Sequence, residues 1–261
     1  MTKSILVFTL ALASATPAFA QAITQSQTQP TTLYHREWEG SFFAGYTFHQ
    51  DYTFRTVVRG RDDSPGVVTM RFTPGYRIGG RVTQNFAEYF SATMEYALTQ
   101  QELRLTNVIK RVPSLNMGHF VHSLMYNIAF SPMPRDSRFR PHIELGTGAL
   151  LFHISDHSKQ DAEDQDHDFD FIIDRDPALD LRLEDSWAIA FNYGVGFKYL
   201  VADKYALTVN ANGRVSGLPT YGLPRTPRVI NGEFTPAIST NGKPMQSWQL
   251  TIGFAHQWDA W

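Results

Sequence analysis

The clearest pattern in the chain is an alternation of large apolar and small or polar positions near its C-terminus. In Gln246 to Trp258, every second position carries Trp, Leu, Ile, Phe, His or Trp, and the positions between them carry Gln, Thr, Gly, Ala and Gln. Residues two apart share one face of a β-strand, so the large side chains point one way and the small or polar ones the other. This is the reverse of the arrangement in soluble proteins, in which apolar side chains face the interior and polar side chains face water. A closed barrel in lipid is the setting that turns the apolar face outward.

Comparable alternation recurs in seven earlier segments: Trp38 to Phe48, Thr69 to Thr83, Tyr89 to Leu103, Leu115 to Phe130, Arg140 to Ile154, Ser186 to Leu200 and Tyr205 to Val215. The connections after the second, fourth and sixth segments are short, whereas those after the first, fifth and seventh are long. Short turns on one side and long loops on the other are typical of transmembrane barrels. The pattern predicts an all-β fold, an eight-stranded antiparallel transmembrane β-barrel. Ten strands are the alternative if Phe169 to Leu183 forms a hairpin, which its charge density disfavours.

The N-terminus has the features of an export signal. Lys3 precedes an apolar stretch, Ile5 to Ala15, and Ala18-Phe19-Ala20 has the small-x-small form of a cleavage site. We therefore expect a signal peptide over residues 1–20, a Gln/Thr-rich disordered leader over 21–36 and a barrel over 37–261. An even number of strands beginning and ending on the short-turn side predicts an outer-membrane protein of a Gram-negative bacterium with both termini in the periplasm.

Composition excludes several classes of protein. The chain has 261 residues, no cysteine and a formal net charge of −2 at pH 7. The lack of cysteine excludes a disulfide framework or a thiolate metal site. The charge argues against a nucleic-acid partner, which would require a basic surface stripe.

One long run resembles a known family. Asn127 to Leu150 contains a strand, a Pro-containing turn and the pattern Arg-Pro-x-x-x-x-Gly-x-Gly from Arg140 to Gly148. This run resembles the corresponding strands of small OmpA/OmpX-like outer-membrane barrels. The resemblance implies the architecture more than an activity. It also implies that the C-terminal strand is an assembly signal for the barrel-insertion machinery, ended by either Trp258 or Trp261.

Charged residues recur on the face predicted to line the lumen. An eight-stranded barrel is only wide enough to be filled by side chains, so these charges must pair with one another. We expect a structural network of salt bridges that plugs the barrel, with a gated pore as the alternative. Its predicted members are Glu39, Arg71, Arg77, Arg81, Glu95, Glu144, Lys198 and Arg214.

The most acidic segment runs from Asp156 to Asp185, and a solvated loop of like charges is the expectation there. Within it, carboxylates occupy every second position at Asp164, Asp166, Asp168 and Asp170. Hard oxygen ligands at this spacing suit weak binding of Ca²⁺ or another divalent cation, but the Gly and distal Glu of an EF-hand loop are missing. Divalent ions could also bridge this segment to lipopolysaccharide phosphates. We expect no other cofactor.

Nucleophilic catalysis is a weaker alternative. His119, His122 and Ser123 supply a base and a hydroxyl, but alternation places His122 and Ser123 on opposite faces. His119 and Ser123 are separated by about 13 Å along one strand, at about 3.3 Å per residue, which is too far for a hydrogen bond. The residues therefore predict a protein that is not an enzyme, with a lipid A-modifying acyl hydrolase as an alternative.

The sequence favours a barrel that contributes to envelope integrity, or to surface binding and adhesion through its long outer loops, with a small passive pore as another alternative. Its expected partners are outer-membrane lipid and lipopolysaccharide, the barrel-assembly machinery and an extracellular ligand. Large aromatic side chains of transmembrane barrels concentrate at the membrane interfaces. In the last strand, the residues expected to serve interface contact and assembly are Trp248, Phe254, Trp258 and Trp261.

Overall fold

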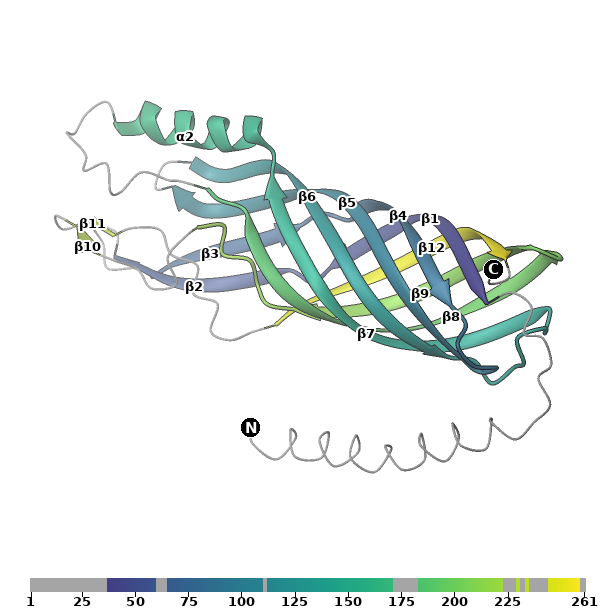
Figure 1. Cartoon of the computed structure of the whole chain (residues 1–261). Coiled ribbons are helices and arrows are strands. Elements are labelled where there is room, and N and C mark those ends of the chain that lie inside the picture. Colours follow the sequence, from purple (N-terminus) through teal and green to yellow (C-terminus); the bar gives the residue numbers. More distant parts are fainter. Residues whose placement is uncertain are drawn as a thin grey trace, which may run out of the picture. The chain divides into compact units, whose positions relative to one another are not determined.

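Eight antiparallel strands close into a barrel in the computed structural model of the chain (Figure 1). Eight strands form one ring, as predicted, but the predicted strand Thr69 to Thr83 is divided between β3, outside the ring, and β4. The strands of the ring, in sequence order, are β1 (Trp38–His49), β4 (Gly75–Gln84), β5 (Phe90–Ile109), β6 (Val112–Phe130), β7 (Phe139–Ile154), β8 (Ser186–Ala202), β9 (Tyr205–Ser216) and β12 (Met245–Trp258).

The structure describes residues 37–59, 65–109, 112–170, 183–222, 229–230, 233–234 and 244–258. The predicted signal peptide and leader, and Trp261, lie outside these ranges. No helix in the described part of the chain is long and apolar enough to cross a membrane.

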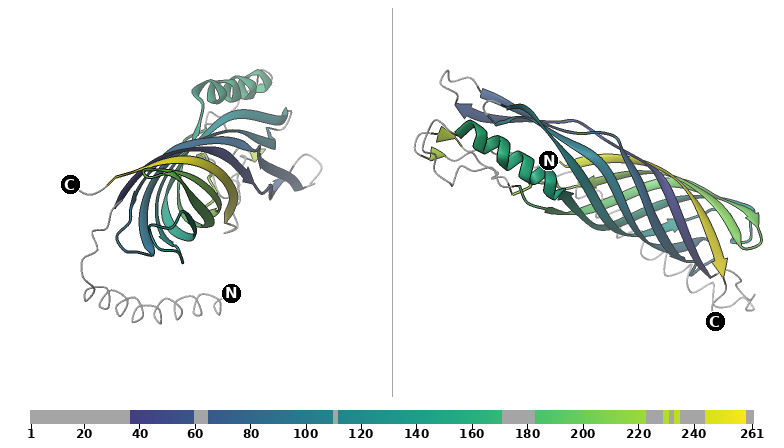
Figure 2. Two further views of the ribbon diagram at one scale, coloured as in Figure 1. Left: turned by 90° about the vertical axis from the view of Figure 1, so that its right-hand side faces the viewer. Right: turned by 90° about the horizontal axis from the view of Figure 1, so that it is seen from above.

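The first and last strands of the ring pair with each other and close it. β1 runs antiparallel to β12 from the Trp38–Trp258 pair to the His49–Ser247 pair, and on its other side β1 pairs with β4. The remaining neighbours follow one another around the ring, and β5 pairs with β6 to complete it. A view rotated by 90° shows the strands curving around a common interior (Figure 2). Because closure leaves no open edge, the backbone N–H and C=O groups of the ring can be satisfied without water.

Two strands extend beyond the ring on the side of the long loops. β2 (Tyr52–Arg59) and β3 (Pro65–Phe72) form a hairpin, and β3 pairs with the distal part of β5. A short two-stranded sheet, β10 (Val229–Ile230) with β11 (Glu233–Phe234), lies in the connection between β9 and β12.

The predicted strand Thr69 to Thr83 is interrupted by a β-bulge. Phe72 pairs with Leu103 and Tyr76 with Gln100, so three residues of one strand lie opposite two of the other. The extra residue reverses which positions face inward. Pro74 suits this place because it has no N–H to donate to a ladder. Phe72 and Tyr76 would share one face of an uninterrupted strand. Here Phe72 is buried, whereas Tyr76 is 66% exposed.

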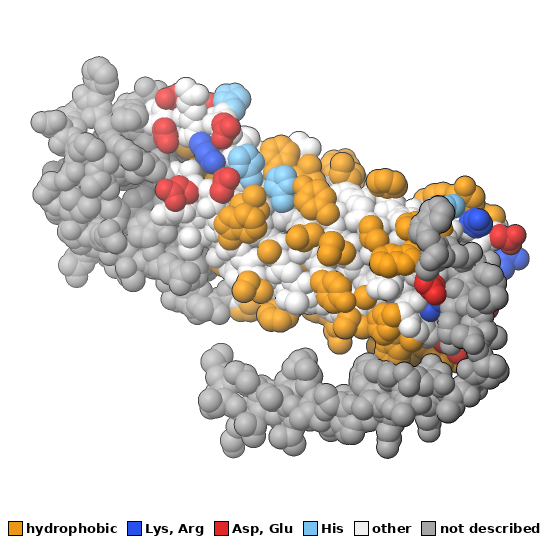
Figure 3. All heavy atoms as spheres, viewed as in Figure 1, with side chains coloured by type: hydrophobic (Ala, Val, Ile, Leu, Met, Phe, Trp, Pro, Cys, Tyr) orange, Lys and Arg blue, Asp and Glu red, His pale blue; other side chains and the backbone are white. Residues whose placement is uncertain are grey.

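The outer wall of the ring is apolar over a continuous band. Side chains expected to point outward are exposed, including Phe42 at 82%, Trp187 at 70% and Ile189 at 70%. Figure 3 shows apolar side chains distributed over the barrel wall. Exposed apolar surface on this scale would be unfavourable in water, and the band therefore matches the hydrocarbon core of a bilayer.

A helix follows β7 where the sequence predicts a solvated loop. α2 (Asp156–Asp170) is capped by Ser155, whose Oγ accepts a hydrogen bond from the Ser158 N–H at 3.3 Å. Asp156 lies in the first turn, where a negative charge interacts favourably with the helix dipole. The expectation of an irregular loop is corrected for this part of the acidic segment, because capping and favourable charge placement stabilise a helix.

A charge placed in the apolar band should destabilise the barrel. Ile252 is 57% exposed and lies between Trp248 and Trp258 on β12. We expect Ile252→Arg to lower the free energy of unfolding in lipid by about 2–4 kcal/mol, the cost of Arg near the bilayer midplane. Urea unfolding of the protein refolded into vesicles measures this change.

Met133→Arg is the matched control, because Met133 is also apolar and 43% exposed but lies in the short turn after β6. Its expected effect is about 0–1 kcal/mol, as for a position near the interface. Equal effects of the two substitutions would contradict the assignment of the band to lipid.

Candidate functional site: the filled interior of the barrel

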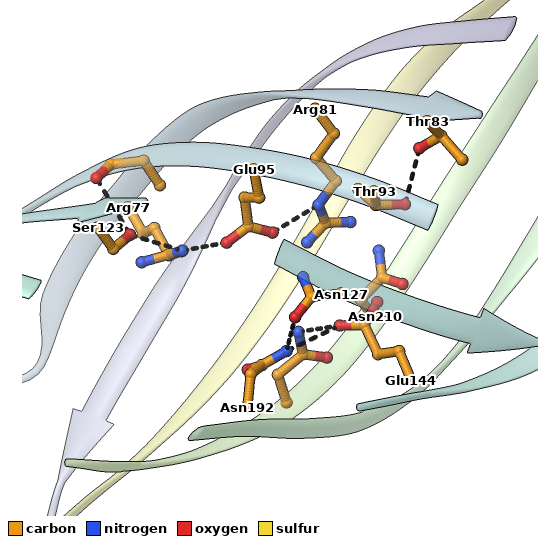
Figure 4. Close-up of polar contacts among 12 residues, drawn as sticks. Arg77, Arg81, Thr83, Thr93, Glu95, Ser123, Asn127, Glu144, Asn192 and Asn210 are labelled. Atoms are coloured by element: carbon orange, nitrogen blue, oxygen red, sulfur yellow. Dashed lines mark hydrogen bonds and ion pairs between the residues drawn. The ribbon is translucent and has the colours of Figure 1, made fainter. Parts of the chain in front are cut away.

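The interior contains a cluster of charges centred on Glu95 (Figure 4). Glu95 on β5 forms ion pairs with Arg77 at 2.5 Å and with Arg81 at 2.6 Å, both on β4. Arg214, on β9 across the lumen, lies 3.6 Å from the same carboxylate. The Arg81 guanidinium also lies over the Phe43 ring, at 4.4 Å from its centroid. Three arginines thus share one buried carboxylate.

A second cluster surrounds Glu144 on β7 and consists mainly of amides. Glu144 accepts hydrogen bonds from Asn212 at 2.5 Å and from Asn192 at 3.2 Å. Asn192 also donates to the Asn127 side-chain oxygen at 3.1 Å. Gly194 makes room for this cluster, since a Cβ atom there would lie 2.3 Å from the Asn212 side-chain oxygen.

A third group lies nearer the short turns. Glu39 on β1 pairs with Lys198 on β8 and accepts a hydrogen bond from Gln257 at 2.9 Å. Gln257 belongs to β12, so this group joins the first and last strands of the ring. The pairing therefore ties the closing seam of the barrel to β8, two strands away from β12.

The structure places the predicted lumen residues in these clusters, with one correction. Glu39, Arg77, Arg81, Glu95, Glu144, Lys198 and Arg214 all reach the interior. Arg71 does not: its side chain is 60% exposed and lies 3.3 Å from Asp51 on the outside. The bulge at Thr73 and Pro74 explains the difference, because it reverses the alternation on which the prediction for Arg71 depended.

Above these clusters, toward the long loops, the interior becomes apolar. Along β5 the inward positions change from Thr99 and Gln101 to Leu103 and Leu105, whereas Glu102 and Arg104 point outward. The buried residues that form this core are Tyr52, Met70, Phe72, Leu103, Leu105, Leu115, Met117, Val121, Met125, Leu150, Phe152, Ile154, Ala162, Leu183, Ala190, Leu218, Tyr221 and Met245. We call this group the apolar plug.

Sequence reasoning missed the apolar plug, although a signal for it was present. The inward positions of a transmembrane barrel were expected to stay polar, and the exchange of polar and apolar faces along β5 contradicts that expectation. Beyond the bilayer the strands are surrounded by water, so the soluble arrangement of apolar inside and polar outside returns. The reversal therefore indicates where β5 leaves the membrane.

Tyr221 closes the plug from a loop after β9. It is fully buried, and its backbone has a φ of 52°, in the left-handed region that non-glycine residues rarely adopt. Its hydroxyl lies 2.8 Å from His119 Nε2, and its carbonyl accepts a hydrogen bond from the Glu184 N–H at 3.0 Å. Burial raises the pKa of Tyr221 well above its ordinary value. Such a conformation costs about 1–3 kcal/mol and persists only where surrounding contacts enforce it.

The residues considered for nucleophilic catalysis have other partners. Ser123 Oγ donates to the Ala97 carbonyl and accepts from Arg77, both at 3.2 Å. His119 contacts Gln101 and Tyr221, whereas His122 faces outward and contacts Tyr96. These hydrogen bonds do not form a nucleophile–base pair.

The carboxylates considered for a metal ion fall within α2. Asp164, Asp166, Asp168 and Asp170 occupy a helix rather than the extended loop for which the every-second spacing was considered. The side chains of the last three lie outside the described residues. In the described part of the chain, no group of three or more His, Cys, Asp or Glu residues could hold a metal ion.

Hydrogen bonds and an ion pair attach the start of α2 to the barrel. Ser158 Oγ accepts a hydrogen bond from the Gly118 N–H at 3.0 Å, and Lys159 forms an ion pair with Asp185 at 2.8 Å. His153 also contacts Asp185, at 2.9 Å. Burial opposes ionisation of Asp185, but the hydrogen bonds from Lys159 and His153 outweigh it and hold its pKa below the ordinary value of 3.8.

Aromatic pairs lie on the outer wall toward both ends of the ring. Trp248 meets Tyr193 edge-on at 5.9 Å between ring centroids, near the long loops. Toward the short turns, Phe254 stacks on Tyr205 at 5.5 Å, and Trp258 stacks on His256 at 6.1 Å. Trp248 and Phe254 are 51% and 53% exposed. Two aromatic belts of this kind mark the membrane interfaces of transmembrane barrels.

Comparison with solved structures supports the same architecture. The chain is similar to the outer membrane protein OprG from Pseudomonas aeruginosa, with a TM-score of 0.50, 15% identity and coverage of 87% of this chain and 98% of OprG. It is also similar to Neisserial surface protein A, with a TM-score of 0.43, 8% identity and coverage of 86% and 99%. It is similar as well to the N-terminal β-barrel domain of Pseudomonas aeruginosa OprF, with a TM-score of 0.37, 12% identity and coverage of 85% of this chain and 98% of that domain.

No protein-family model and no curated protein matches the chain. At 15% identity, the likeness to OprG shows the fold alone. The fold is that of small eight-stranded outer-membrane barrels, in agreement with the resemblance to OmpA/OmpX-like proteins.

Neutralising Glu95 should strongly destabilise the barrel. Glu95→Gln leaves Arg77, Arg81 and Arg214 without their shared carboxylate, and removing one partner of a buried pair costs about 3–5 kcal/mol. The midpoint of urea unfolding in lipid measures the loss. Asp51→Asn is the matched control, since it breaks the exposed pair with Arg71 and should cost about 0–1 kcal/mol. A loss for Glu95→Gln as small as that of the control would show that the network does not support the barrel.

Acid should loosen α2 from the barrel. Because the pKa of Asp185 is lowered in the folded protein, its stabilising contribution is complete above pH 3.8 and is lost as the pH falls through the lower folded value. We expect amide protection of residues 158–164, relative to intrinsic exchange rates, to fall over that range. Asp185→Asn should show reduced protection already at neutral pH and little further change on acidification. Unchanged protection in Asp185→Asn at neutral pH would contradict this role.

Proposed function

We propose that the protein is a non-conducting, non-enzymatic barrel of the Gram-negative outer membrane that acts in envelope integrity or surface binding. The observation that carries this proposal is the filling of the interior by two successive layers. The Glu95 cluster crosses the lumen, and the apolar plug lies beyond it. A barrel filled in this way meets macromolecular partners through its outer surface.

The two layers oppose permeation for different reasons. An ion reaching the Glu95 cluster would have to separate buried ion pairs, which leaves uncompensated charge in the interior. Beyond that cluster it would meet apolar side chains, among which a charged or strongly hydrated solute loses its hydration. A small passive pore therefore has less support than a closed barrel.

The proposed orientation places the short turns and both termini in the periplasm and the long loops outside the cell. Transmembrane barrels carry short periplasmic turns and longer extracellular loops. In this orientation α2 and the β2–β3 hairpin are on the outer surface. The C-terminal strand, with Trp258 near its end, faces the side from which the barrel-assembly machinery acts.

The surface candidate for partner binding is α2. Its described acidic side chains Asp156, Asp161, Glu163 and Asp164 are exposed, while Ala162 is buried against the apolar plug. The helix is thus held on the barrel with carboxylates turned toward solvent (Figure 3). We propose that this surface meets an extracellular ligand or, through divalent cations, the phosphates of lipopolysaccharide.

Planar-bilayer recording tests the closed lumen. We expect wild-type protein to show no sustained conductance. The double variant Tyr221→Ala/Met70→Ala should conduct ions only if the apolar plug alone blocks the lumen. Sustained wild-type conductance that changes in Arg77→Gln would favour the passive pore. Correct insertion in each case is checked by resistance of the folded band to SDS without heating.

Complementation of a deletion strain tests the role of the outer surface. We expect deletion to increase sensitivity to detergent or chelator, or to reduce surface binding, and the wild-type gene to restore either property. A variant in which Asp156, Asp161, Glu163 and Asp164 become Asn or Gln should insert normally and fail to restore it. The control variant neutralises Asp136 and Asp203, which lie exposed in the short turns.

Two outcomes would contradict the proposed function. Full restoration of the wild-type phenotype by the α2 variant would show that the acidic surface of α2 is not needed for the function. A changed lipid A mass spectrum on overexpression of inserted protein would instead favour the acyl hydrolase.

A further inference from the structure

A polar cavity lies inside the barrel at the end with the short turns. The space in it that is open to water-sized molecules is about 50 Å³. Its lining includes side chains from five strands: Glu39 on β1, Arg81 on β4, Arg140 on β7, Lys198 on β8 and Asn210 on β9. The cavity is separate from the apolar plug and from α2, and the proposed function makes no use of it.

Two cationic residues lie opposite each other at this cavity. Arg140 on β7 and Lys198 on β8 are directly paired in the strand register, and both line the cavity. Like charges directly opposite on neighbouring strands destabilise a sheet unless something compensates them. Lys198 is compensated by Glu39, but no ion pair is found for Arg140 among the described residues. Its Nη2 reaches only the Glu88 carbonyl, at a long 3.5 Å.

Three buried polar atoms on the cavity wall have no hydrogen-bond partner in the described part of the chain. They are Arg140 Nε, Thr208 Oγ1 and Asn210 Nδ2, and each can donate. Arg140 and Thr208 are 6% exposed and Asn210 is 3% exposed. A buried donor without an acceptor costs about 1–3 kcal/mol, so one acceptor group in the cavity that met these three donors would be stabilised there.

The register brings these donors close together. Lys198 on β8 pairs with Arg140 on β7 and with Thr208 on β9. Two residues further along these strands, Gly196 pairs with His142 and Asn210 in the same way. His142 Nε2 lies 2.9 Å from the Asn210 side-chain oxygen, which leaves the amide nitrogen of Asn210 as the free group. A Cβ at Gly196 would lie 2.3 Å from the Asn210 oxygen and 2.7 Å from His142, so glycine there allows this arrangement.

The interior also carries more positive than negative charge. The cationic side chains facing it are Arg77, Arg81, Arg140, Lys198 and Arg214, and the carboxylates are Glu39, Glu95 and Glu144. The guanidinium of Arg135 binds the Asn85 and Ala87 carbonyls at the turns. Positive charge surrounded by low-dielectric walls attracts anions.

We propose that this cavity is a binding site for an oxyanion, the phosphate or carboxylate group of a small molecule or of an envelope component. The planar fork of Arg140 matches two oxygens of such a group, beside the ion pair of Lys198 with Glu39. Thr208 and Asn210 supply neutral donors that orient the group. The carboxylates of the cavity do not exclude it, because Glu39 is engaged by Lys198 and Gln257, and Glu144 by Asn192 and Asn212.

Binding of inorganic phosphate to the refolded full chain in detergent micelles tests this site. We expect titration followed by NMR to shift the amide signals of Thr208 and Asn210 saturably, while signals of Leu103 and Leu105 in the apolar plug stay in place. Acetate in a parallel titration distinguishes carboxylate from phosphate. Equal saturable shifts with both anions indicate a site for either group, and a shift with one assigns the ligand class.

Arg140→Gln should weaken phosphate binding at least about tenfold, since it removes a charged donor. The matched control is Arg138→Gln, two residues away, because Arg138 is exposed and lies over the Tyr199 ring at 5.2 Å. The control should bind phosphate as the wild type does. Thr208→Val keeps every charge and should weaken binding less than Arg140→Gln.

The proposal is overturned if folded wild-type protein binds neither anion saturably, or if Arg140→Gln and Arg138→Gln bind equally. If Arg140→Gln fails to fold, the wild-type titration and Thr208→Val still decide the matter, because Thr208→Val removes one proposed donor and unchanged affinity in that variant would contradict the site. Loss of the α2-dependent phenotype is independent of these outcomes, so failure of one proposal leaves the other intact.

Discussion

Closure of the sheet is the constraint on which the rest of the structure depends. Backbone polar groups cannot be left unsatisfied in hydrocarbon, where each costs several kcal/mol, so the first strand must meet the last. The pairing of β1 with β12 along its length meets this demand. Once the ring is closed, each strand has lipid on one side and a narrow interior on the other. The side chains then follow from which of these two surroundings each position meets.

The narrow interior is filled in two different ways along its length. Near the short turns, charges and amides pair around Glu95, Glu144 and Glu39, where glycines such as Gly194 and Gly196 leave room for them. Toward the long loops, apolar side chains pack against Tyr221 and the base of α2. Along β5, the polar part is matched to the segment of wall that is apolar outside, and the apolar part to the segment that is polar outside.

The strands and most inward charges could be predicted because alternation of period two survives wherever one side of a strand meets lipid. Arg71 could not, since a single extra residue at the bulge reverses every position beyond it and leaves no composition signal of its own. The helix at Asp156 was also missed, because its acidic composition resembles that of a solvated loop while its cap is one serine. Contacts between distant segments, such as Tyr221 with His119, have no pattern in the sequence.

The bulge beside Pro74 has a consequence for how this surface can change over time. Below it, outward positions must stay apolar and inward positions can exchange polar residues as long as their partners change together. Above it the requirement is reversed: outward positions such as Arg71 and Glu102 are free to vary in water, whereas Met70 and Phe72 are fixed by packing. The exposed part of the protein can therefore diversify at its solvent-facing positions without any cost to the span that holds it in the membrane.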